Sequence, residues 1–360
     1  MRSSLPVTAV TMLTTNTCTA ACAHCCMKSS PDRRGALTAE VMRSVVARLH
    51  EAGDLSTVIF AGGEPTMLKG ALEEAIRFAA ELGLNTRVVT NASWATTEER
   101  AFARLSRLRA AGLAELNISA DDFHLPDVPF ERVENAWRAA KRLDFRAVVI
   151  ANCSGPDSLV TPDWIMERLG EELPLRFDDD GESAPLPDEP GTHFGVSNAR
   201  LQRLREDVDV GAVHVELDEA ALNRPCPFAG RSIAIGPDAS LLACCGFEVA
   251  ADSPLHFGDA AQTDVVDLLR RAYDDLLVNA VAELGPYFLM RFAQAKDPSL
   301  VFKPAYGGIC EICFDVTSRR EVLDVLDAHR EELAGYLYRR VRTYSGAPDP
   351  SARETADTPS

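Results

Sequence analysis

The feature that most constrains the fold is an alternation of short apolar segments with amphipathic segments through the first half of the chain. The short segments are rich in β-branched residues and have the length of buried strands. Between them, apolar residues recur every three or four positions, which is typical of helices with one buried face. Strands alternating with helices predict a parallel sheet with helices on its outside. The expected strands are residues 7–15, 57–61, 85–90, 114–119, 145–152 and 174–177.

Three cysteines follow the first expected strand with the spacing C-x3-C-x2-C, namely Cys18, Cys22 and Cys25. In such sheets the carboxyl ends of the strands carry the chemistry, and this loop begins at one of them. Three soft thiolates can hold three corners of a [4Fe–4S] cubane, which leaves the fourth iron open to a small molecule. The spacing also fits a zinc site with Cys26 or His24 as the fourth ligand.

A second motif, Gly62-Gly-Glu-Pro65, stands directly after the strand expected at 57–61. The cysteine loop and this motif together resemble the radical S-adenosylmethionine (SAM) superfamily, in which the cluster loop follows the first strand and Gly-Gly-Glu-Pro ends the second. One difference is His24, because the family usually has an aromatic residue before the third cysteine. The resemblance implies an α/β fold, a partial (β/α)6 TIM-like barrel, and it disfavours zinc. Cys26 is expected to point away from the cluster.

The resemblance also implies cofactors and an activity. The open iron of a [4Fe–4S] cluster chelates the amino and carboxylate groups of SAM, and an electron from the cluster releases a 5′-deoxyadenosyl radical. An electron donor such as flavodoxin or ferredoxin is therefore an expected partner. The residues expected to bind SAM are Gly62, Gly63, Glu64 and Pro65 at its methionine end, Ser119 at its ribose, and Asn91. For Asn91 and Ser119, the alternative is a structural role at strand ends.

Four further residues stand near strand ends and are candidates for catalysis. Asp121, Asp122 and His124 follow the fourth strand, where they would bind substrate or accept a proton. Their alternative role is the capping of a loop. Cys153 closes the fifth strand, where its thiol would return a hydrogen atom to a substrate radical. Its alternative role is that of a small buried hydrophobic residue.

A second cysteine group stands in the C-terminal half of the chain. It resembles the auxiliary-cluster extensions of radical SAM enzymes, and the shorter twitch type more than the longer SPASM type, because no cysteine follows Cys313. The resemblance implies a second [4Fe–4S] cluster, and a structural zinc site is the alternative. Cys245 competes with Cys244, and Ala239 replaces a glycine usual at the turn, so we expect that turn to differ locally. The expected ligands are Cys226, Cys244, Cys310 and Cys313.

Composition shifts divide the chain further. Residues 178–197 are rich in Asp, Glu, Pro and Gly, which predicts a linker or a loop over the barrel mouth. Ser318-Arg-Arg-Glu321 has the pattern of a capping box and predicts a last helix, packed on the barrel. The expected segments are the barrel at 1–178, a linker or lid at 179–225, a small auxiliary iron–sulfur domain at 226–317, the C-terminal helix at 318–343 and a disordered tail at 344–360.

Composition and charge exclude several classes of function. A net charge of −17 argues against nucleic acid as a partner, because phosphate binding needs clustered Lys and Arg. No run of about 18 apolar residues and no secretory signal are present, so we expect no membrane partner. Ten cysteines without an export signal indicate metal or redox ligands in a reducing cytoplasm.

Three functions are compatible with these patterns. The favoured one abstracts hydrogen from a C–H bond of a peptide or small natural product and ends in oxidation, with the auxiliary cluster accepting an electron. The second is epimerisation, in which a cysteine returns hydrogen from the opposite face. The third is a non-catalytic iron–sulfur or zinc protein. Because 17 residues precede Cys18, we expect no separate domain there to capture a leader peptide.

Overall fold

The computed structural model describes residues 5–178, 191–204, 214–245 and 247–345. Its strands form one ten-stranded sheet in the order β10-β9-β8-β1-β2-β3-β4-β5-β7-β6. Neighbouring strands from β8 to β6 run parallel, and β9 is antiparallel to both β8 and β10. The strands are β1 (Ala9–Leu13), β2 (Thr57–Ala61), β3 (Asn85–Thr90), β4 (Glu115–Ser119), β5 (Ala147–Cys153), β6 (Leu175–Asp178), β7 (His193–Ala199), β8 (Ser232–Ile235), β9 (Ser240–Leu242) and β10 (His256–Asp259).

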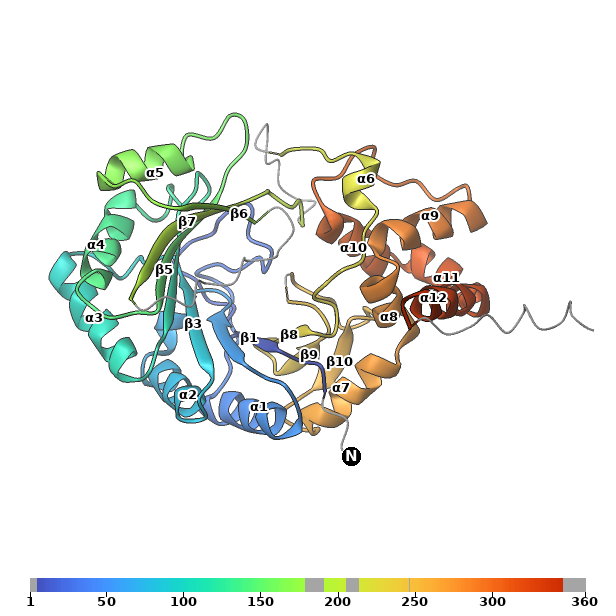
Figure 1. Cartoon of the computed structure of the whole chain (residues 1–360), viewed down its shortest axis with the longest axis horizontal. Coiled ribbons are helices and arrows are strands. Elements are labelled where there is room, and N and C mark those ends of the chain that lie inside the picture. The colour runs from blue at the N-terminus through green and yellow to red at the C-terminus, as the bar shows by residue number, and fades with distance from the viewer. Residues whose placement is uncertain (1–4, 179–190, 205–213, 246, 346–360) are drawn as a thin grey trace, which may run out of the picture.

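Helices α1 to α5 cover the outer face of the curved parallel strands, so the sheet forms a partial barrel (Figure 1). The predicted fold class is thereby confirmed. The core lies between strands and outer helices, with Phe60, Trp137 and Phe145 among its largest fully buried side chains. The helices are α1 (Ala39–Ala52), η1 (Pro65–Leu68), α2 (Gly70–Glu81), α3 (Glu98–Ala110), α4 (Phe130–Ala140), α5 (Pro162–Leu169), α6 (Glu219–Leu222), α7 (Val265–Asp274), α8 (Leu276–Glu283), α9 (Pro286–Lys296), α10 (Ile309–Ser318), α11 (Arg320–Ala328) and α12 (Arg330–Ser345).

Local signals account for most of these elements. Helix α1, for example, begins where the Thr38 hydroxyl accepts a hydrogen bond from the Val41 N–H, as a good N-cap does. Its buried residues form an apolar stripe, Met42, Val45, Val46 and Leu49. The stripe packs on the sheet and leaves the charged face of the helix outside.

The sixth position of the barrel differs from the prediction. β7 pairs with β5, and β6, the predicted sixth strand, lies outside β7 at the edge of the sheet. β7 lies within the predicted linker or lid. Its sequence, HFGVSNA, shows little alternation of apolar and polar residues, so periodicity alone did not reveal it. Residues 179–190 and 205–213 of the expected lid fall outside the described part.

The C-terminal part extends the sheet on the β1 side. β8 pairs in parallel with β1, and β8 and β9 form an antiparallel pair. Ala239 in their turn has a φ of +66°, in the left-handed region. The alanine therefore takes a conformation that costs an L-residue roughly 1–2 kcal/mol.

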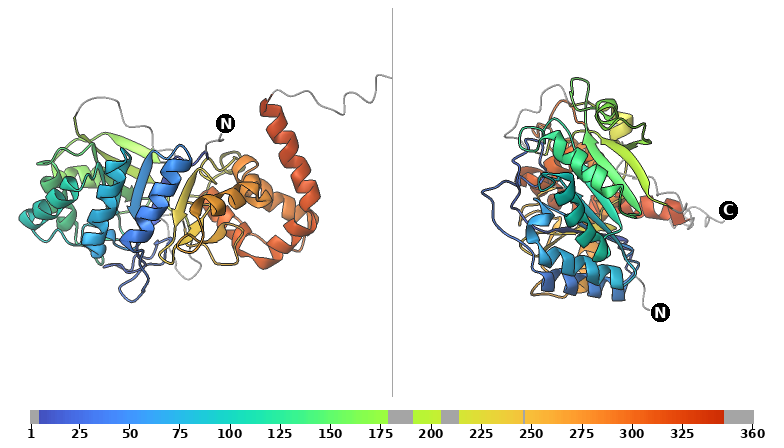
Figure 2. Two further views of the ribbon diagram at one scale, coloured as in Figure 1. Left: turned by 90° about the horizontal axis from the view of Figure 1, so that it is seen from below. Right: turned by 90° about the vertical axis from the view of Figure 1, so that its left-hand side faces the viewer.

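The predicted capping box is wrong. Ser318 is the last residue of α10, and its hydroxyl donates to the Phe314 carbonyl in the same helix. Arg319 has an extended backbone and separates α10 from α11, and α11 begins without a side-chain cap. The C-terminal segment is therefore two helices, α11 and α12. α12 packs on α8 and projects away from the barrel, contrary to the expected packing (Figure 2).

No single helix among the described residues is long and apolar enough to cross a membrane. Only together do helices α8 and α9 have the length and apolar composition of a membrane span, and the two are bent by 115° relative to each other.

Candidate functional site

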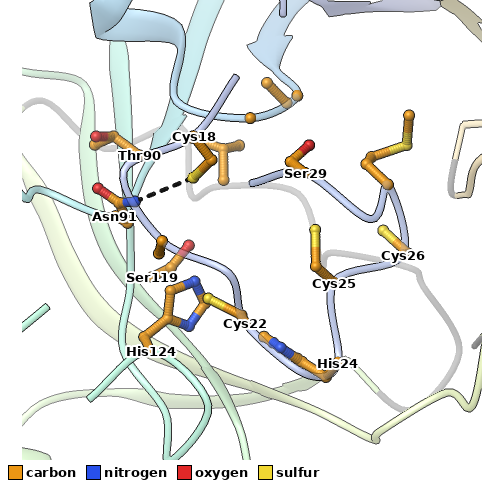
Figure 3. A pocket seen from close by; sticks show the side chains of 16 residues that line it. Cys18, Cys22, His24, Cys25, Cys26, Ser29, Thr90, Asn91, Ser119 and His124 are labelled. Atoms are coloured by element: carbon orange, nitrogen blue, oxygen red, sulfur yellow. Dashed lines mark hydrogen bonds between the residues drawn. The ribbon is translucent and has the colours of Figure 1, made fainter. Parts of the chain in front are cut away.

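The first cysteine group lines a cavity of about 210 Å³ at the carboxyl ends of β1 to β4. The walls come from the loop after β1 and from the ends of the next three strands (Figure 3). The cavity brings together eight of the residues predicted for this site: Cys18, Cys22, Cys25, Gly62, Gly63, Asn91, Ser119 and His124. Cys26 lines the same cavity, so the expectation that it points away is not met.

The two glycines after β2 bring that strand against the cysteine loop. The Gly63 N–H donates to the Thr15 carbonyl at 2.6 Å, and the Glu64 N–H donates to the Thr17 carbonyl at 3.0 Å. A Cβ on Gly63 would lie 2.0 Å from the Thr17 oxygen. Gly62 has a φ of +117°, where only glycine is unstrained. The motif therefore holds the start of the cysteine loop through its backbone.

Glu64 joins the end of β2 to the end of β3. Its buried carboxylate accepts hydrogen bonds from Thr66, from the Thr90 hydroxyl and from the Asn91 N–H. Burial raises the pKa of Glu64, although these hydrogen bonds oppose the rise. The side chain does not line the cavity, and Pro65 opens η1. Both residues thus support the site, and their contact with SAM stays a prediction.

Asn91 reaches from the end of β3 to the first cysteine. Its Nδ2 donates to the Thr19 hydroxyl at 3.0 Å and lies 3.5 Å from the Cys18 sulfur. Hydrogen bonds to ligand sulfurs orient a ligand and tune a cluster. Ser119 lines the cavity from the end of β4.

Asp121, after β4, binds two imidazoles. Its Oδ1 lies 2.8 Å from His124 Nδ1, and its Oδ2 lies 3.2 Å from His24 Nε2. Burial raises the pKa of Asp121, but the hydrogen bonds with both histidines outweigh it and lower the pKa. Burial lowers the pKa of His124, but Asp121 and Cys22 outweigh it and raise the pKa. Asp121 is therefore ionised and His124 charged, and each is engaged with the other.

Asp127 is a site residue that the sequence analysis did not single out. Its carboxylate accepts a hydrogen bond from the Ala21 N–H at 2.7 Å and so holds the middle of the cysteine loop. Only the fold brings the loop after β4 to Ala21, since 106 positions separate the two residues. No local pattern in the sequence marks this contact.

The remaining two catalytic candidates lie outside the cavity wall. Both oxygens of Asp122 accept backbone N–H groups, from Leu159 and Val160 at 2.9 Å, as in a loop cap. Cys153 ends β5, and burial together with the charge of Asp121 raises its pKa to about 12. Its thiol is therefore protonated at neutral pH.

Residues 12–157 match the family model of the radical SAM superfamily. This part of the chain is a radical SAM domain. Three thiols beside an open cavity whose wall also carries asparagine, serine and glycine fit the [4Fe–4S] cluster and SAM of that family. In such proteins, the three cysteines hold the cluster.

Several solved structures are similar to this chain at low sequence identity. The structure of anSMEcpe with AdoMet and a Cp18Cys peptide is 12% identical, with a TM-score of 0.50 over 92% of this chain and 99% of that chain. BtrN with AdoMet and 2-DOIA is 11% identical, with a TM-score of 0.44 over 78% and 89%. SuiB of Streptococcus suis, bound to S-adenosylmethionine, is 14% identical, with a TM-score of 0.43 over 78% and 69%. No curated protein matches the sequence.

Beyond the radical SAM domain, the second cysteine group lines a separate cavity of about 40 Å³. Apart from sulfur, the side chains around it are almost all apolar. Burial raises the pKa of Cys310 to about 12 and of Cys245 to about 11, and neighbouring thiols add to both shifts. These thiols would lose their protons to a bound metal. The cysteines of this cavity are Cys226, Cys244, Cys245, Cys310 and Cys313.

The radical SAM loop and the second cysteine group are joined through Glu248. The Glu248 N–H donates to the Cys26 carbonyl at 3.0 Å. Its carboxylate lies 2.7 Å from Arg33 Nη2 and 3.7 Å from Lys28 Nζ. Glu248 follows Cys245 by three positions. The segment that carries Cys244 and Cys245 therefore contacts the loop after β1 that carries the first cysteine group.

Proposed function

We propose that this protein is a radical SAM enzyme that removes a hydrogen atom from a C–H bond of a peptide or small natural product and completes a net two-electron oxidation. The observation that carries the proposal is the second cavity, in which five cysteines face one another beside the radical SAM loop. A second cluster at that place would act as an electron acceptor close to the site where the substrate radical forms.

The first site would prepare the radical. Cys18, Cys22 and Cys25 would hold the [4Fe–4S] cluster, and SAM would bind beside them in the cavity. When bound, the cluster and SAM together supply reductive cleavage of a carbon–sulfur bond and a 5′-deoxyadenosyl radical. The chain's own part is to hold the loop by the backbone of Gly63 and Glu64, to orient Cys18 through Asn91, and to exclude water from the cavity.

The second site would take the next electron. Cys226, Cys244, Cys310 and Cys313 would hold a second [4Fe–4S] cluster through four thiolates, and when bound that cluster would supply an electron acceptor. The net reaction removes one hydrogen atom, one electron and one proton from the substrate, and a base accepts the proton. An external donor such as flavodoxin or ferredoxin supplies the first electron.

Epimerisation is the second candidate function, and the placement of Cys153 at the carboxyl end of β5 favours it. A hydrogen-atom donor must carry an S–H bond, which a cysteine thiol does at neutral pH. In this case, the substrate radical receives a hydrogen atom from the opposite face, and no electron reaches the second cluster.

A first experiment tests the class. Anaerobically reconstituted protein is incubated with SAM and a reductant, and 5′-deoxyadenosine is measured. Formation of 5′-deoxyadenosine supports the proposed radical SAM activity. Its absence in protein that holds zinc in place of iron would favour a non-catalytic protein. The substrate is then sought by untargeted comparison of metabolites and peptides in cells with and without the protein. Peptides belong in that search, because the anSMEcpe structure, which shares the fold, was solved with one.

A second experiment separates the two outcomes. With a substrate in hand, the reaction is run in deuterated water. Oxidation predicts one 5′-deoxyadenosine per product and no solvent deuterium on the reacting carbon. One deuterium on an inverted carbon, lost in Cys153→Ala or Cys245→Ala, would establish epimerisation instead.

A further inference from the structure

We infer that the exposed face of α12 is an interface between two copies of this chain, in which two α12 helices pack antiparallel about a two-fold axis. The inference goes beyond the proposed function and does not depend on it. It is carried by the spacing, sizes and charges of the side chains along α12 and by the way in which this helix leaves the rest of the chain.

One face of α12 packs on its own chain. Leu333 is fully buried, and the ring of Tyr336 meets the rings of Phe288 and Phe292 in α9, with centroids 5.3 and 6.0 Å apart. Leu337 continues this face and is half-buried. These positions are three and four residues apart, as on one side of any helix. They account for the attachment of α12 to α8 and α9.

Another side of α12 carries a second stripe with helical spacing. Its residues, at positions 331, 334, 338 and 341, are all exposed. Tyr338 is 59% and Val341 47% exposed, and α12 holds three of the seven large hydrophobic side chains that are exposed among the described residues. Steps of three and four residues are the pattern of the seam between two paired helices. The stripe therefore has the form of a helix-pairing surface.

The sizes of the side chains along this stripe are self-complementary. In an antiparallel pair centred on residue 336, Tyr338 of each copy lies over Ala334 of the other copy, and Val341 lies level with Glu331. A large side chain then faces a small one on both sides of the axis, as in well-packed helix pairs. A two-fold axis uses the same surface on both copies and closes the contact, so a dimer is the expected assembly.

The charges along α12 favour the antiparallel orientation. Glu331 lies in the first turn, close to the exposed Asp327 of α11, whereas Arg339 and Arg340 are exposed in the C-terminal half. An antiparallel pair brings the basic half of one helix beside the acidic half of the other, and a parallel pair brings like charges together. Packed helices lie roughly 8–10 Å apart, within about one Debye length at physiological salt.

The direction of α12 leaves space for a second copy. The helix has 16 residues, a length of about 24 Å, and projects away from the barrel (Figure 2). In the antiparallel pair, the remaining parts of the two chains lie at opposite ends of the helix pair. Because each copy contributes mainly one helix, the interface is smaller than the standard size of about 1,600 Å², and we expect a dissociation constant on the order of micromolar.

The experiment is sedimentation velocity of the reconstituted full chain over concentrations below and above the expected dissociation constant. The wild type should form dimers, and the dissociation constant should rise with salt. Ala334→Tyr places two tyrosines at each contact, so dimerisation should weaken by about tenfold or more. The alanine is exposed, so the variant should unfold at the temperature of the wild type.

A second variant tests the register. Ala334→Tyr combined with Tyr338→Ala exchanges the large and the small side chain, so the pair is again complementary and dimerisation should return to within a few-fold of the wild type. Ala103→Tyr is the matched control, because Ala103 is an exposed alanine in α3, and this variant should dimerise like the wild type.

A full chain that stays monomeric at every concentration would overturn the inference, whether residues 346–360 or another molecule cover the face. A dimer that Ala334→Tyr leaves unchanged would also overturn it, because the interface would then lie elsewhere. Failure of the folded double variant to dimerise would overturn the antiparallel register. None of these outcomes bears on the proposed function, which is tested by the formation of 5′-deoxyadenosine.

Discussion

The two cysteine cavities differ in size and in the chemistry of their walls. The first has a volume of about 210 Å³ and is lined by histidine, asparagine, serine and glycine backbone as well as sulfur. The second has about 40 Å³ and, apart from sulfur, almost only apolar walls. Room and hydrogen-bonding groups beside three thiols suit a cluster that also binds a polar molecule. A small apolar chamber with more thiols suits a metal group that the protein closes off completely.

The cavities also differ in how the chain assembles them. The first three cysteines stand within eight residues, and backbone hydrogen bonds from Gly63 and Glu64 hold their loop. The second set comes from three separate segments, the last of them the first two turns of α10. We therefore expect the second site to depend more strongly on metal for its folded geometry, because metal binding contributes to folding where ligands come from distant segments.

The largest expected effect is the loss of the first site. Replacing Cys18, Cys22 and Cys25 by alanine should abolish SAM cleavage and remove about half of roughly eight irons, since two cubanes are expected in the wild type. Iron analysis and assay of 5′-deoxyadenosine measure both effects. Unchanged iron content would contradict the separation into one open and one closed site.

The next effect distinguishes the roles of Cys244 and Cys245 in the second cavity. Cys244→Ala should lose or loosen the second cluster, because a cubane corner opened to water is labile, whereas Cys245→Ala should keep both clusters. Both residues line the cavity, so the variants are closely matched. If Cys245→Ala is instead the variant that loses about half of the iron, the fourth ligand is Cys245.

A third prediction tests whether the close approach of Gly63 positions the cysteine loop of the first cavity. Gly63→Ala puts a Cβ 2.0 Å from the Thr17 carbonyl oxygen, so the cysteine loop must move. We expect SAM binding to weaken at least tenfold, with the second cluster retained. Gly70→Ala is the matched control, because a Cβ there meets nothing within 4 Å and alanine favours the helix by up to about 1 kcal/mol. Equal SAM affinity of the two variants would show that the close approach is dispensable.

The smallest effect concerns the contact between the two sites. Arg33→Ala removes the ion pair with Glu248 and two hydrogen bonds, to the carbonyls of Met27 and Lys28. The groups are partly exposed, so we expect a loss of about 1 kcal/mol or less in unfolding free energy and a few-fold weaker SAM binding. High salt should reduce the difference between variant and wild type. A difference that persists at high salt would mean that the ion pair is not its source.

Local patterns predicted the radical SAM half well, because its strands, helix caps and motifs are each encoded within a few residues. The cysteine loop and Gly62-Gly-Glu-Pro65 are examples. The errors fall where distant partners decide the outcome. β7 takes the sixth barrel position through its pairing with β5, and Asp127 reaches Ala21 only in the folded barrel. At Ser318, a bond to the carbonyl of the preceding turn replaced the expected cap.

The place of β1 in the sheet has a consequence for the order in which the protein folds during synthesis. Ala9 pairs with Thr57 on one side and with Ser232 on the other. At a typical rate of about 5–20 residues per second, ribosomes complete the second partner roughly 10–45 s after β1 emerges. Throughout that interval one edge of β1 is unpaired, and it is the strand from which the first cysteine loop departs. Slow passage through this stage favours wrong pairing between chains, because an unpaired strand edge is a template for association.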